Sequence, residues 1–299
     1  QRIVQYLEIP LGCAVLKRFA DGEVAVSIAE SVRGYHVYVV QSACPPVNEH
    51  LMELLVMIDA LKRASASAIT VVLPYYGYAR QDRKAAPREP ITAKLVADLL
   101  EAAGATRLIS LDLHAAQIQG FFNIPVDNLY SAPIFIKHIN SNFASLDDVM
   151  MVSPDVGGVA RTRYLASRLN VSMAIIDKRR DKPGQSEVVN IIGDVNNKTC
   201  IIFDDIVDSA GTLCNAAELL LSVGARKVLA YGTHGVLSNG AIDRITSSKL
   251  DKLVVTDSIS QDHKICDKLE VVSIANLLAE AIKRVACNAS IANLFDLNI

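Results

Sequence analysis

The stretch that decides the fold is IIFDDIVDSAGT, residues 201–212. Apolar residues lead into the adjacent acids Asp204 and Asp205, a third acid, Asp208, follows, and the stretch closes in a turn of small residues. Carboxylates crowded at the end of a buried strand repel one another unless a ligand or a metal ion compensates them. The next residues, GTLCNAAELLLSVG, read as a helix, so the acids lie between a strand and a helix N-terminus. Open α/β sheets bind ligands at this place.

The rest of the chain repeats this alternation of strand and helix. Residues 48–64 carry apolar side chains at helical spacing, with Asn48 as the expected N-cap. Residues 90–104 open with proline and close with glycine, as helices commonly do. Continuous apolar strands between such helices predict an α/β fold with largely parallel sheets covered by helices. The expected strands are residues 36–41, 69–74, 107–113, 149–154, 173–178, 199–204, 227–234 and 253–258.

Two segments of the chain resemble each other at an offset of 120 residues. LEAAGATRLISLDLH (100–114) matches LLSVGARKVLAYGTH (220–234) in leucine, Gly-Ala, a basic residue and the closing histidine. The match has two explanations: chance convergence of two helix–glycine–strand connections, or a tandem pair of similar domains. The second predicts domains at residues 1–130 and 131–299, with the boundary where polar residues and a proline interrupt the pattern.

Composition sets limits on the class of protein. Of the 299 residues 51% are hydrophobic and 21% charged, which allows a large buried core, and the net charge of −2 gives no overall attraction to nucleic acid or membrane. No apolar run reaches the roughly 18 residues that span a bilayer, and the start of the chain lacks signal-peptide character. The six scattered cysteines form no C-x-x-C pair, so we expect reduced, mostly buried thiols, no zinc cluster and a cytoplasmic protein.

The small-residue turn at 208–212 has a specific chemical use. The backbone N–H groups of Ser209 to Thr212 would cradle a phosphate, and Asp204 and Asp205 would face a group rich in hydroxyls, such as a ribose. The alternative is a loop with solvated acids in which Asp208 caps the helix.

A second stretch, YARQDRKAAPREP (78–90), concentrates basic residues without apolar periodicity. The chain has no G-x-x-x-x-G-K-[ST] motif, so a bound ATP would need other cations, and arginines suit bidentate contacts to phosphate. The bland alternative is a solvated basic loop. The four basic side chains are Arg80, Arg83, Lys84 and Arg88.

The sequence DDIVDSAGT resembles the phosphoribosyl pyrophosphate loop of type I phosphoribosyltransferases and of ribose-phosphate pyrophosphokinases, with Ser209 where threonine is usual. Four further stretches resemble the second family, in its class I form, and the likeness runs through nearly the whole chain. The family usually has one more strand and turn before QRIVQYLEIPLG, so this sequence begins late relative to the family. Trimming or disorder is one explanation, and if the strand is truly absent the first sheet loses an edge. The four stretches are FADGE (19–23), residues 75–95, LDLHAAQIQGFF (111–122) and residues 152–180.

This resemblance implies two tandem type I phosphoribosyltransferase-like domains and a role for each motif. Lys178 and Arg180 would be catalytic residues on a mobile flap, and His114 with Asp155, on neighbouring strand ends, would hold Mg²⁺ largely through water. ATP would contact Phe19, Asp21, Glu23, Arg80 and Gln81. Ribose 5-phosphate would contact Arg180, Asp204, Asp205, Asp208, Ser209, Ala210, Gly211 and Thr212. Taken without the resemblance, these are an Asp-Gly turn, a structural histidine, a helix cap and a solvated basic turn.

The implied reaction moves the β,γ-diphosphoryl group of ATP to the 1-hydroxyl of ribose 5-phosphate, which gives 5-phosphoribosyl 1-pyrophosphate and AMP for nucleotide biosynthesis. Two alternatives stay open. A phosphoribosyltransferase would consume that product and would need neither a second domain nor an ATP site. A non-catalytic homologue that regulates active subunits would show losses at the catalytic positions, and none is seen.

The resemblance also implies a homohexamer that phosphate activates and ADP inhibits. The expected anion contacts are Ser31, Arg33, Ser65, Arg88 and Ser290. Pro87 and Ala292 stand where the family usually has serine. Because lost donors reduce the difference in phosphate affinity between states, we predict a weaker response to phosphate than family members usually show.

Overall fold

The computed structural model describes residues 1–179, 188–264 and 266–295. Contacts group the chain into two compact units: residues 1–130 with 274–299, and residues 131–273. The sequence analysis placed residues 274–299 with the second domain, whereas in this grouping they accompany the first unit, because α8 (Ala275–Ala286) packs against α1 (Arg2–Leu7).

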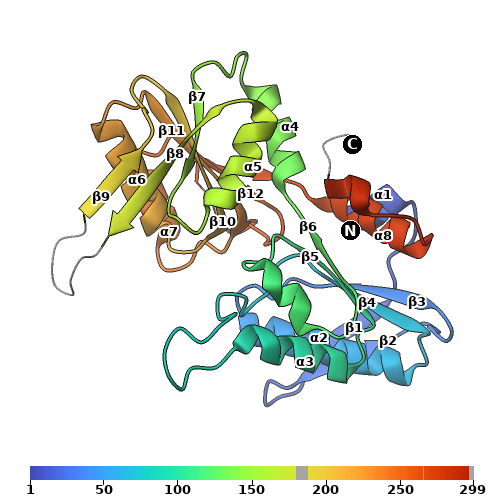
Figure 1. The fold of residues 1–299 in the computed structure, drawn as a ribbon. Helices are drawn as coiled ribbons and strands as arrows, with labels where there is room; N and C mark the ends of the chain where they lie inside the picture. The colour runs from blue at the N-terminus through green and yellow to red at the C-terminus, as the bar shows by residue number, and fades with distance from the viewer. Residues whose placement is uncertain (180–187, 265, 296–299) are drawn as a thin grey trace. The chain divides into compact units, whose positions relative to one another are not determined.

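The first unit is built on a small parallel sheet with the strand order β3-β4-β5-β6. A separate antiparallel hairpin, β1 (Ala14–Arg18) and β2 (Val24–Ile28), precedes it. Figure 1 shows α2 and α3 together on one side of this sheet. The sheet strands and the remaining helices are β3 (His36–Val40), β4 (Ala68–Leu73), β5 (Arg107–Leu111), β6 (Val126–Leu129), α2 (Val47–Arg63), α3 (Thr92–Ala103) and the short 3-10 helices Ala116–Phe121 and Ala292–Phe295.

Helix α2 shows how the apolar spacing becomes packing. Its buried residues Leu51, Leu54, Ile58 and Leu61 recur at intervals of three or four, so they form one stripe against the sheet. The expected cap is wrong, because Pro46 is the N-cap residue and no side chain caps this helix. Asn48 lies inside the first turn, where its Oδ1 accepts a hydrogen bond from the hydroxyl of Tyr78.

The second unit holds a seven-stranded sheet with the order β13-β12-β11-β10-β7-β8-β9. All neighbouring strands are parallel except the β8–β9 pair. Helices α6 and α7 supply one buried layer, while Phe135 of α4 meets Phe203 and Tyr231 on the other face. The elements are α4 (Ala132–Asn142), β7 (Val149–Ser153), α5 (Val159–Leu169), β8 (Ser172–Arg179), β9 (Val188–Ile192), β10 (Thr199–Val207), α6 (Gly211–Ser222), β11 (Lys227–Gly235), α7 (Ala241–Ser247), β12 (Lys252–Thr256) and β13 (Leu269–Val272).

The strand order places a topological switch point between β7 and β10. From β7 the chain moves outward to β8 and β9, whereas from β10 it moves outward in the opposite direction to β11, β12 and β13. A crevice forms outside the carboxyl ends of two such strands, and ligands of open α/β sheets bind there. The described part of the four-stranded sheet runs in sequence order and has no such reversal.

All eight expected strands are present, and the sheets confirm the two-sheet α/β prediction. The repeated segment corresponds to α3–Gly104–β5 in one unit and α6–Gly224–β11 in the other. Both glycines follow their helix with positive φ, 128° and 101°, so the same helix–glycine–strand connection occurs in both units. The expected strands omitted β1, β2, β6, β9 and β13.

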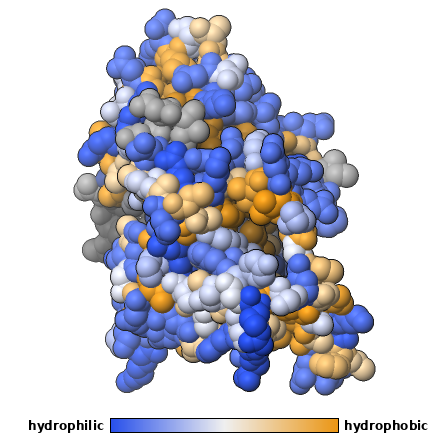
Figure 2. All heavy atoms as spheres, turned by 90° about the vertical axis from the view of Figure 1, so that its right-hand side faces the viewer, coloured by the Kyte–Doolittle hydropathy of each residue, from blue (hydrophilic) through white to orange (hydrophobic). Residues whose placement is uncertain are grey.

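The cysteines are more exposed than the sequence analysis expected. All six cysteines, which lie within the described ranges, are free, but only Cys200 and Cys214 are buried, so the prediction of mostly buried thiols is wrong. Hydrophobic residues also reach the surface between hydrophilic ones (Figure 2), with Leu11, Phe19 and Tyr35 among the more exposed. Within the described ranges no helix combines the length and apolar character that crossing a bilayer requires.

Candidate functional site

The acids Asp204 and Asp205 belong to strand β10 itself. Strand β10 continues to Val207, so the acids lie within it and do not follow it as the sequence analysis expected. Asp204 is in register with Gly232 of β11, where an added Cβ would come within 2.3 Å of Val207 Cγ2. This glycine therefore allows β10 and β11 to pack closely beside the acids.

The two carboxylates have different partners. Asp205 is buried, and its Oδ1 lies 2.5 Å from Nη1 of Arg161, which α5 supplies. Asp204 accepts a hydrogen bond from the Asp205 backbone N–H at 2.9 Å. Burial raises the pKa of Asp204 to about 8, and the charges of Asp205 and Asp155 add to the rise. A cation or hydroxyl donors that bind here would offset the repulsion among these carboxylates and favour the ionised form of Asp204.

The turn at residues 208–212, called the phosphate turn below, joins β10 to α6. Ala210 is the N-cap of α6 in the left-handed conformation, φ 59°, and Gly211 is the first helical residue. A Cβ added at Gly211 would meet only Ser209 Oγ, at 3.7 Å, and the φ of this glycine is not among the positive ones. Neither packing nor backbone geometry therefore requires glycine here, whereas a ligand that approaches the helix N-terminus would.

The alternative role of Asp208 as a helix cap is wrong, because no side chain caps α6. Asp208 Oδ1 instead accepts a hydrogen bond from the hydroxyl of Ser238. Ser209 and Thr212 are exposed at the turn, so their hydroxyl groups can reach a ligand.

The two expected metal ligands lie on different sheets. His114 follows β5 in the four-stranded sheet, whereas Asp155 follows β7 in the seven-stranded one, so the expectation of neighbouring strand ends is wrong. Asp155 is exposed, and its Oδ1 accepts a hydrogen bond at 2.8 Å from the N–H of Gly158, the N-cap residue of α5. Among the described residues no three His, Cys, Asp or Glu side chains form a group that could hold a metal ion.

The FADGE stretch forms the turn of the β1–β2 hairpin. Phe19 and Glu23 are joined by a backbone hydrogen bond of 2.9 Å, and Asp21 Oδ1 accepts the Glu23 N–H at 3.1 Å. The Phe19 side chain is 61% exposed, which leaves its ring faces accessible for stacking. The Asp-Gly turn expected from the residues alone is present, and the adenine role stays a prediction.

The basic stretch forms an irregular connection between β4 and α3. Arg80 and Gln81 are exposed, and Gln81 Oε1 accepts a hydrogen bond from the Thr92 hydroxyl at 2.8 Å. Glu89 accepts the N–H groups of residues 85 and 86, which closes a small turn within the stretch. The start of α3 therefore holds Gln81, which is next to Arg80 in the basic stretch.

Only one residue of the predicted catalytic pair, Lys178, lies within the described residues. Lys178 is a β8 residue whose backbone pairs with Val189 of β9. Arg180 lies outside the described residues.

The expected effector residues all belong to the first unit. A hydrogen bond of 2.9 Å from Gly34 N–H to the Ser65 carbonyl brings the segments of Arg33 and Ser65 together. Arg88 is exposed with φ 67°, and the Ser290 carbonyl accepts a hydrogen bond from Arg284 at 3.0 Å. Ser31 is also exposed.

Three side chains near the phosphate turn were not predicted from the sequence: Arg161, Ser238 and Arg244. Arg244, on α7, donates a hydrogen bond from Nη1 to the Ser209 carbonyl. Their partners are distant in sequence, so no local spacing marks them. The strand order alone brings them together.

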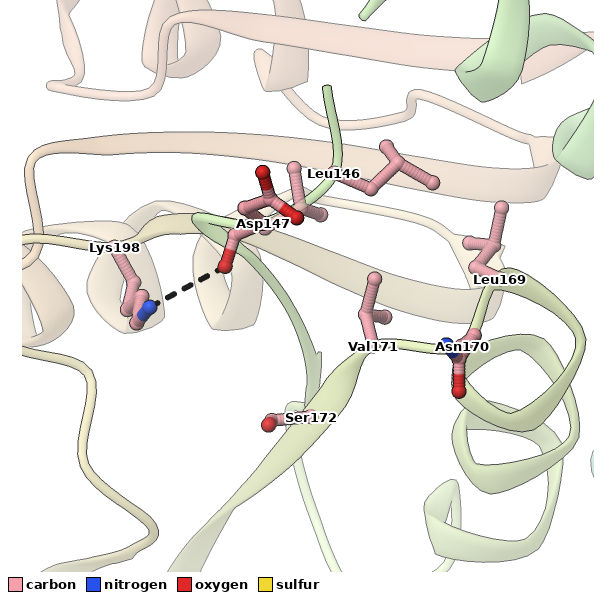
Figure 3. Close-up of a pocket in the computed structure, with 8 residues that line it drawn as sticks. Leu146, Asp147, Leu169, Asn170, Val171, Ser172 and Lys198 are labelled. Carbon is pink, nitrogen blue, oxygen red and sulfur yellow. Dashed lines mark hydrogen bonds between the residues drawn. The ribbon is translucent and has the colours of Figure 1, made fainter.

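A separate pocket of about 330 Å³ lies at the amino-terminal ends of strands β7 and β8 (Figure 3). It is lined at the start of β7 and β8, away from the carboxyl ends where the phosphate turn lies. Lys198 Nζ donates to the Asp147 carbonyl at 3.4 Å across its rim. This pocket therefore takes no part in the site described above.

The switch point, the paired acids and the phosphate turn together define an α/β protein of the type I phosphoribosyltransferase type. Residues 1–104 match the family model for the N-terminal domain of ribose phosphate pyrophosphokinase, and residues 178–296 match that for the phosphoribosyl synthetase-associated domain. The chain belongs to the ribose-phosphate pyrophosphokinase family.

Relatives match over nearly the full length. The ribose-phosphate pyrophosphokinases of Brucella melitensis biotype 1 and Agrobacterium fabrum are each 59% identical over 99% of this chain and 96% of their own. The crystal structure of phosphoribosylpyrophosphate synthetase from Mycobacterium smegmatis superposes with a TM-score of 0.91 at 43% identity, over 96% of this chain and 95% of that one.

Proposed function

We propose that the chain is a ribose-phosphate diphosphokinase, which transfers the β,γ-diphosphoryl group of ATP to the 1-hydroxyl of ribose 5-phosphate. The oxygen of that hydroxyl forms a bond to Pβ, the bond between Pβ and the α,β-bridging oxygen breaks, AMP leaves, and the hydroxyl proton is released. The observation that carries the proposal is the phosphate turn at the switch point, beside two strand-borne acids, in a chain of this family.

The ribose 5-phosphate contacts follow from the shape of the turn. The 5-phosphate would lie against the N–H groups of Ser209 to Thr212, over Gly211, where the absence of a side chain leaves room. Asp204 and Asp205 would accept hydrogen bonds from the ribose hydroxyls. Arg161 holds Asp205 in one orientation, so this acceptor is in place before the sugar arrives.

ATP would bind through residues of the first unit. The exposed ring of Phe19 offers a stacking surface for adenine, and Asp21 and Glu23 offer acceptors for its amino group or for the ribose. Arg80 and Gln81 lie on the basic connection before α3 and would bind the phosphates, with the guanidinium as a bidentate donor.

The proposed cofactor is Mg²⁺, held largely through water. Asp155 offers a carboxylate at the switch point and raises the pKa of Asp204 through its charge, so negative charge there exceeds what Arg161 alone compensates. His114, which follows β5 in the first unit, is a further candidate ligand for Mg²⁺. When bound, Mg²⁺ neutralises polyphosphate charge and acidifies the attacking hydroxyl.

Lys178 and Arg180 would stabilise the negative charge that develops around Pβ. Lys178 is the second-last residue of β8. Preorganised cations of this kind act chiefly in the transition state, so removal of one is expected to lower kcat more than it alters either KM.

Assembly and control complete the proposal. We expect a homohexamer of class I type that acts in the cytoplasm, and the exposed apolar residues Leu11, Val15 and Leu16 offer a surface for copies of the chain to cover. Ser31, Arg33, Ser65, Arg88 and Ser290 would bind the effector anions phosphate and ADP.

The test is formation of AMP by the purified protein with ATP, ribose 5-phosphate and Mg²⁺. We expect AMP whose appearance depends on all three. No AMP above background would contradict the proposal. Consumption of added 5-phosphoribosyl 1-pyrophosphate in the presence of a purine base would instead identify a phosphoribosyltransferase.

A further inference from the structure

Three successive carbonyl groups, those of residues 207–209, are held by one neighbouring segment of the chain. The backbone N–H groups of Leu237 and Ser238 donate to the first two, at 3.0 and 3.1 Å. Arg244 Nη1 donates to the third. The segment 237–244, which follows β11 and enters α7, therefore fixes each peptide plane between β10 and the N-cap of α6.

The direction of these carbonyls determines the direction of the N–H groups. In a planar trans peptide the C=O and N–H bonds point to opposite sides. The N–H groups that belong to the same three peptides are those of residues 208–210, so they face away from segment 237–244. Successive N–H groups that share a side, next to the first turn of a helix, form an anion-binding concavity.

The segment carries backbone strain at the same place. Leu237 has φ 49° although it is buried, and Asn239 has φ 51°. The left-handed region is unfavourable for leucine, whereas asparagine adopts it more readily, and such strain persists where the surrounding structure fixes it, often near functional sites. Two further contacts fix this segment: the Ser238 hydroxyl on Asp208 Oδ1, and the Cys214 thiol on the Arg244 carbonyl at 3.8 Å.

We infer that Arg244 is a positioning residue for ribose 5-phosphate, because it turns the peptide between Ser209 and Ala210 so that its N–H faces the phosphate. This inference rests on the proposed function. Ser209 and Ala210 are the last residues of the connection from β10 to α6. Within the described residues, Arg244 is the side chain that donates a hydrogen bond to the Ser209 carbonyl. Removal of the guanidinium frees the peptide to rotate, which weakens phosphate binding without touching the ATP residues.

The test compares Arg244→Gln, Arg244→Lys and a matched control, Lys249→Gln. Lys249 is an exposed residue just beyond α7 whose Nζ lies 3.8 Å from Glu218, so the control removes one positive charge close to the same helix. Initial rates give both KM values, and hydrogen exchange of peptides covering residues 208–214 is followed with and without ribose 5-phosphate. Wild-type AMP formation is measured first, so failure of the proposed function is seen separately.

A hydrogen bond to a charged group contributes enough that its loss corresponds to roughly 10-fold or more in affinity. For Arg244→Gln we expect the KM for ribose 5-phosphate to rise by that factor and the KM for ATP to stay within about 2-fold. Arg244→Lys should restore most of the loss, because lysine keeps a long side chain with a charged donor, whereas the glutamine amide is neutral and ends two bonds short of Nη1. Ligand-induced slowing of exchange should therefore be lost only in Arg244→Gln. Equal rises in both KM values, or an Arg244→Gln enzyme indistinguishable from Lys249→Gln, would overturn the inference.

Discussion

Replacement of Arg161 by glutamine tests how much the ion pair with the buried Asp205 contributes to stability. The Asp205 side chain is 5% exposed and that of Arg161 is 30% exposed, with 2.5 Å between Oδ1 and Nη1. Removing one partner of a fully buried ion pair costs about 3–5 kcal/mol, whereas exposed pairs contribute less than about 1 kcal/mol. Because solvent reaches the arginine, we expect Arg161→Gln to lower the free energy of unfolding by about 2 kcal/mol, between these two limits. In a unit of roughly 150 residues this lowers Tm by about 4–8 °C.

The assay is scanning calorimetry in EDTA, without substrates, with Arg163→Gln as the matched control. Arg163 is exposed on the same helix, so its replacement should change the free energy of unfolding by less than about 0.5 kcal/mol. The double variant Arg161→Gln/Asp205→Asn should regain much of the lost stability, because a neutral amide leaves no unpaired charge. The reasoning is refuted if Arg161→Gln matches Arg163→Gln, or if the double variant is less stable than Arg161→Gln.

Four further outcomes are expected. Gly211→Val should abolish ribose 5-phosphate binding in calorimetry and leave ATP binding intact, because the added side chain fills the cradle beside Ser209 Oγ; unchanged affinity would show that the phosphate lies elsewhere. Lys178→Ala should reduce kcat about 10²–10³-fold with little change in either KM, and a rise confined to KM would make Lys178 a ground-state binder. Asp204→Asn should gain stability over the wild type as pH rises from about 4 to 8, because the raised pKa means that the folded state holds its proton more tightly than the unfolded state; a Tm difference independent of pH would argue against this. Phosphate should activate only weakly at constant ionic strength while light scattering reports an oligomer; steep activation that disappears in Arg33→Ala would show that Pro87 and Ala292 do not matter, and a monomeric mass would remove the assembly claim.

Much of the fold follows from local signals. The part of β10 that precedes Asp204 and Asp205 is a continuous apolar run, and the glycines at 104 and 224 adopt the positive φ that a helix end commonly uses. These signals need no knowledge of distant residues. The hairpin strand β1 was not predicted because all five of its residues are exposed, so it shows no burial pattern.

The parts of the site that could not be predicted depend on strand order. Arg161 meets Asp205 because β7 lies beside β10, and no spacing in the sequence records that neighbourhood. The same limit explains why His114 and Asp155 were expected on neighbouring strands although they belong to different sheets. Local pattern identifies strand ends, but the assignment of each strand to a sheet is a tertiary property.

The most direct test of the account is ³¹P NMR of the products formed from ATP and ribose 5-phosphate with Mg²⁺. The proposed transfer predicts one AMP for each 5-phosphoribosyl 1-pyrophosphate, whose diphosphoryl resonances arise from the β- and γ-phosphorus atoms of ATP. Both products should disappear when ribose 5-phosphate is left out. ADP with a ribose bisphosphate, which would mean transfer of the γ-phosphoryl group alone, or the absence of both expected products, would contradict the account.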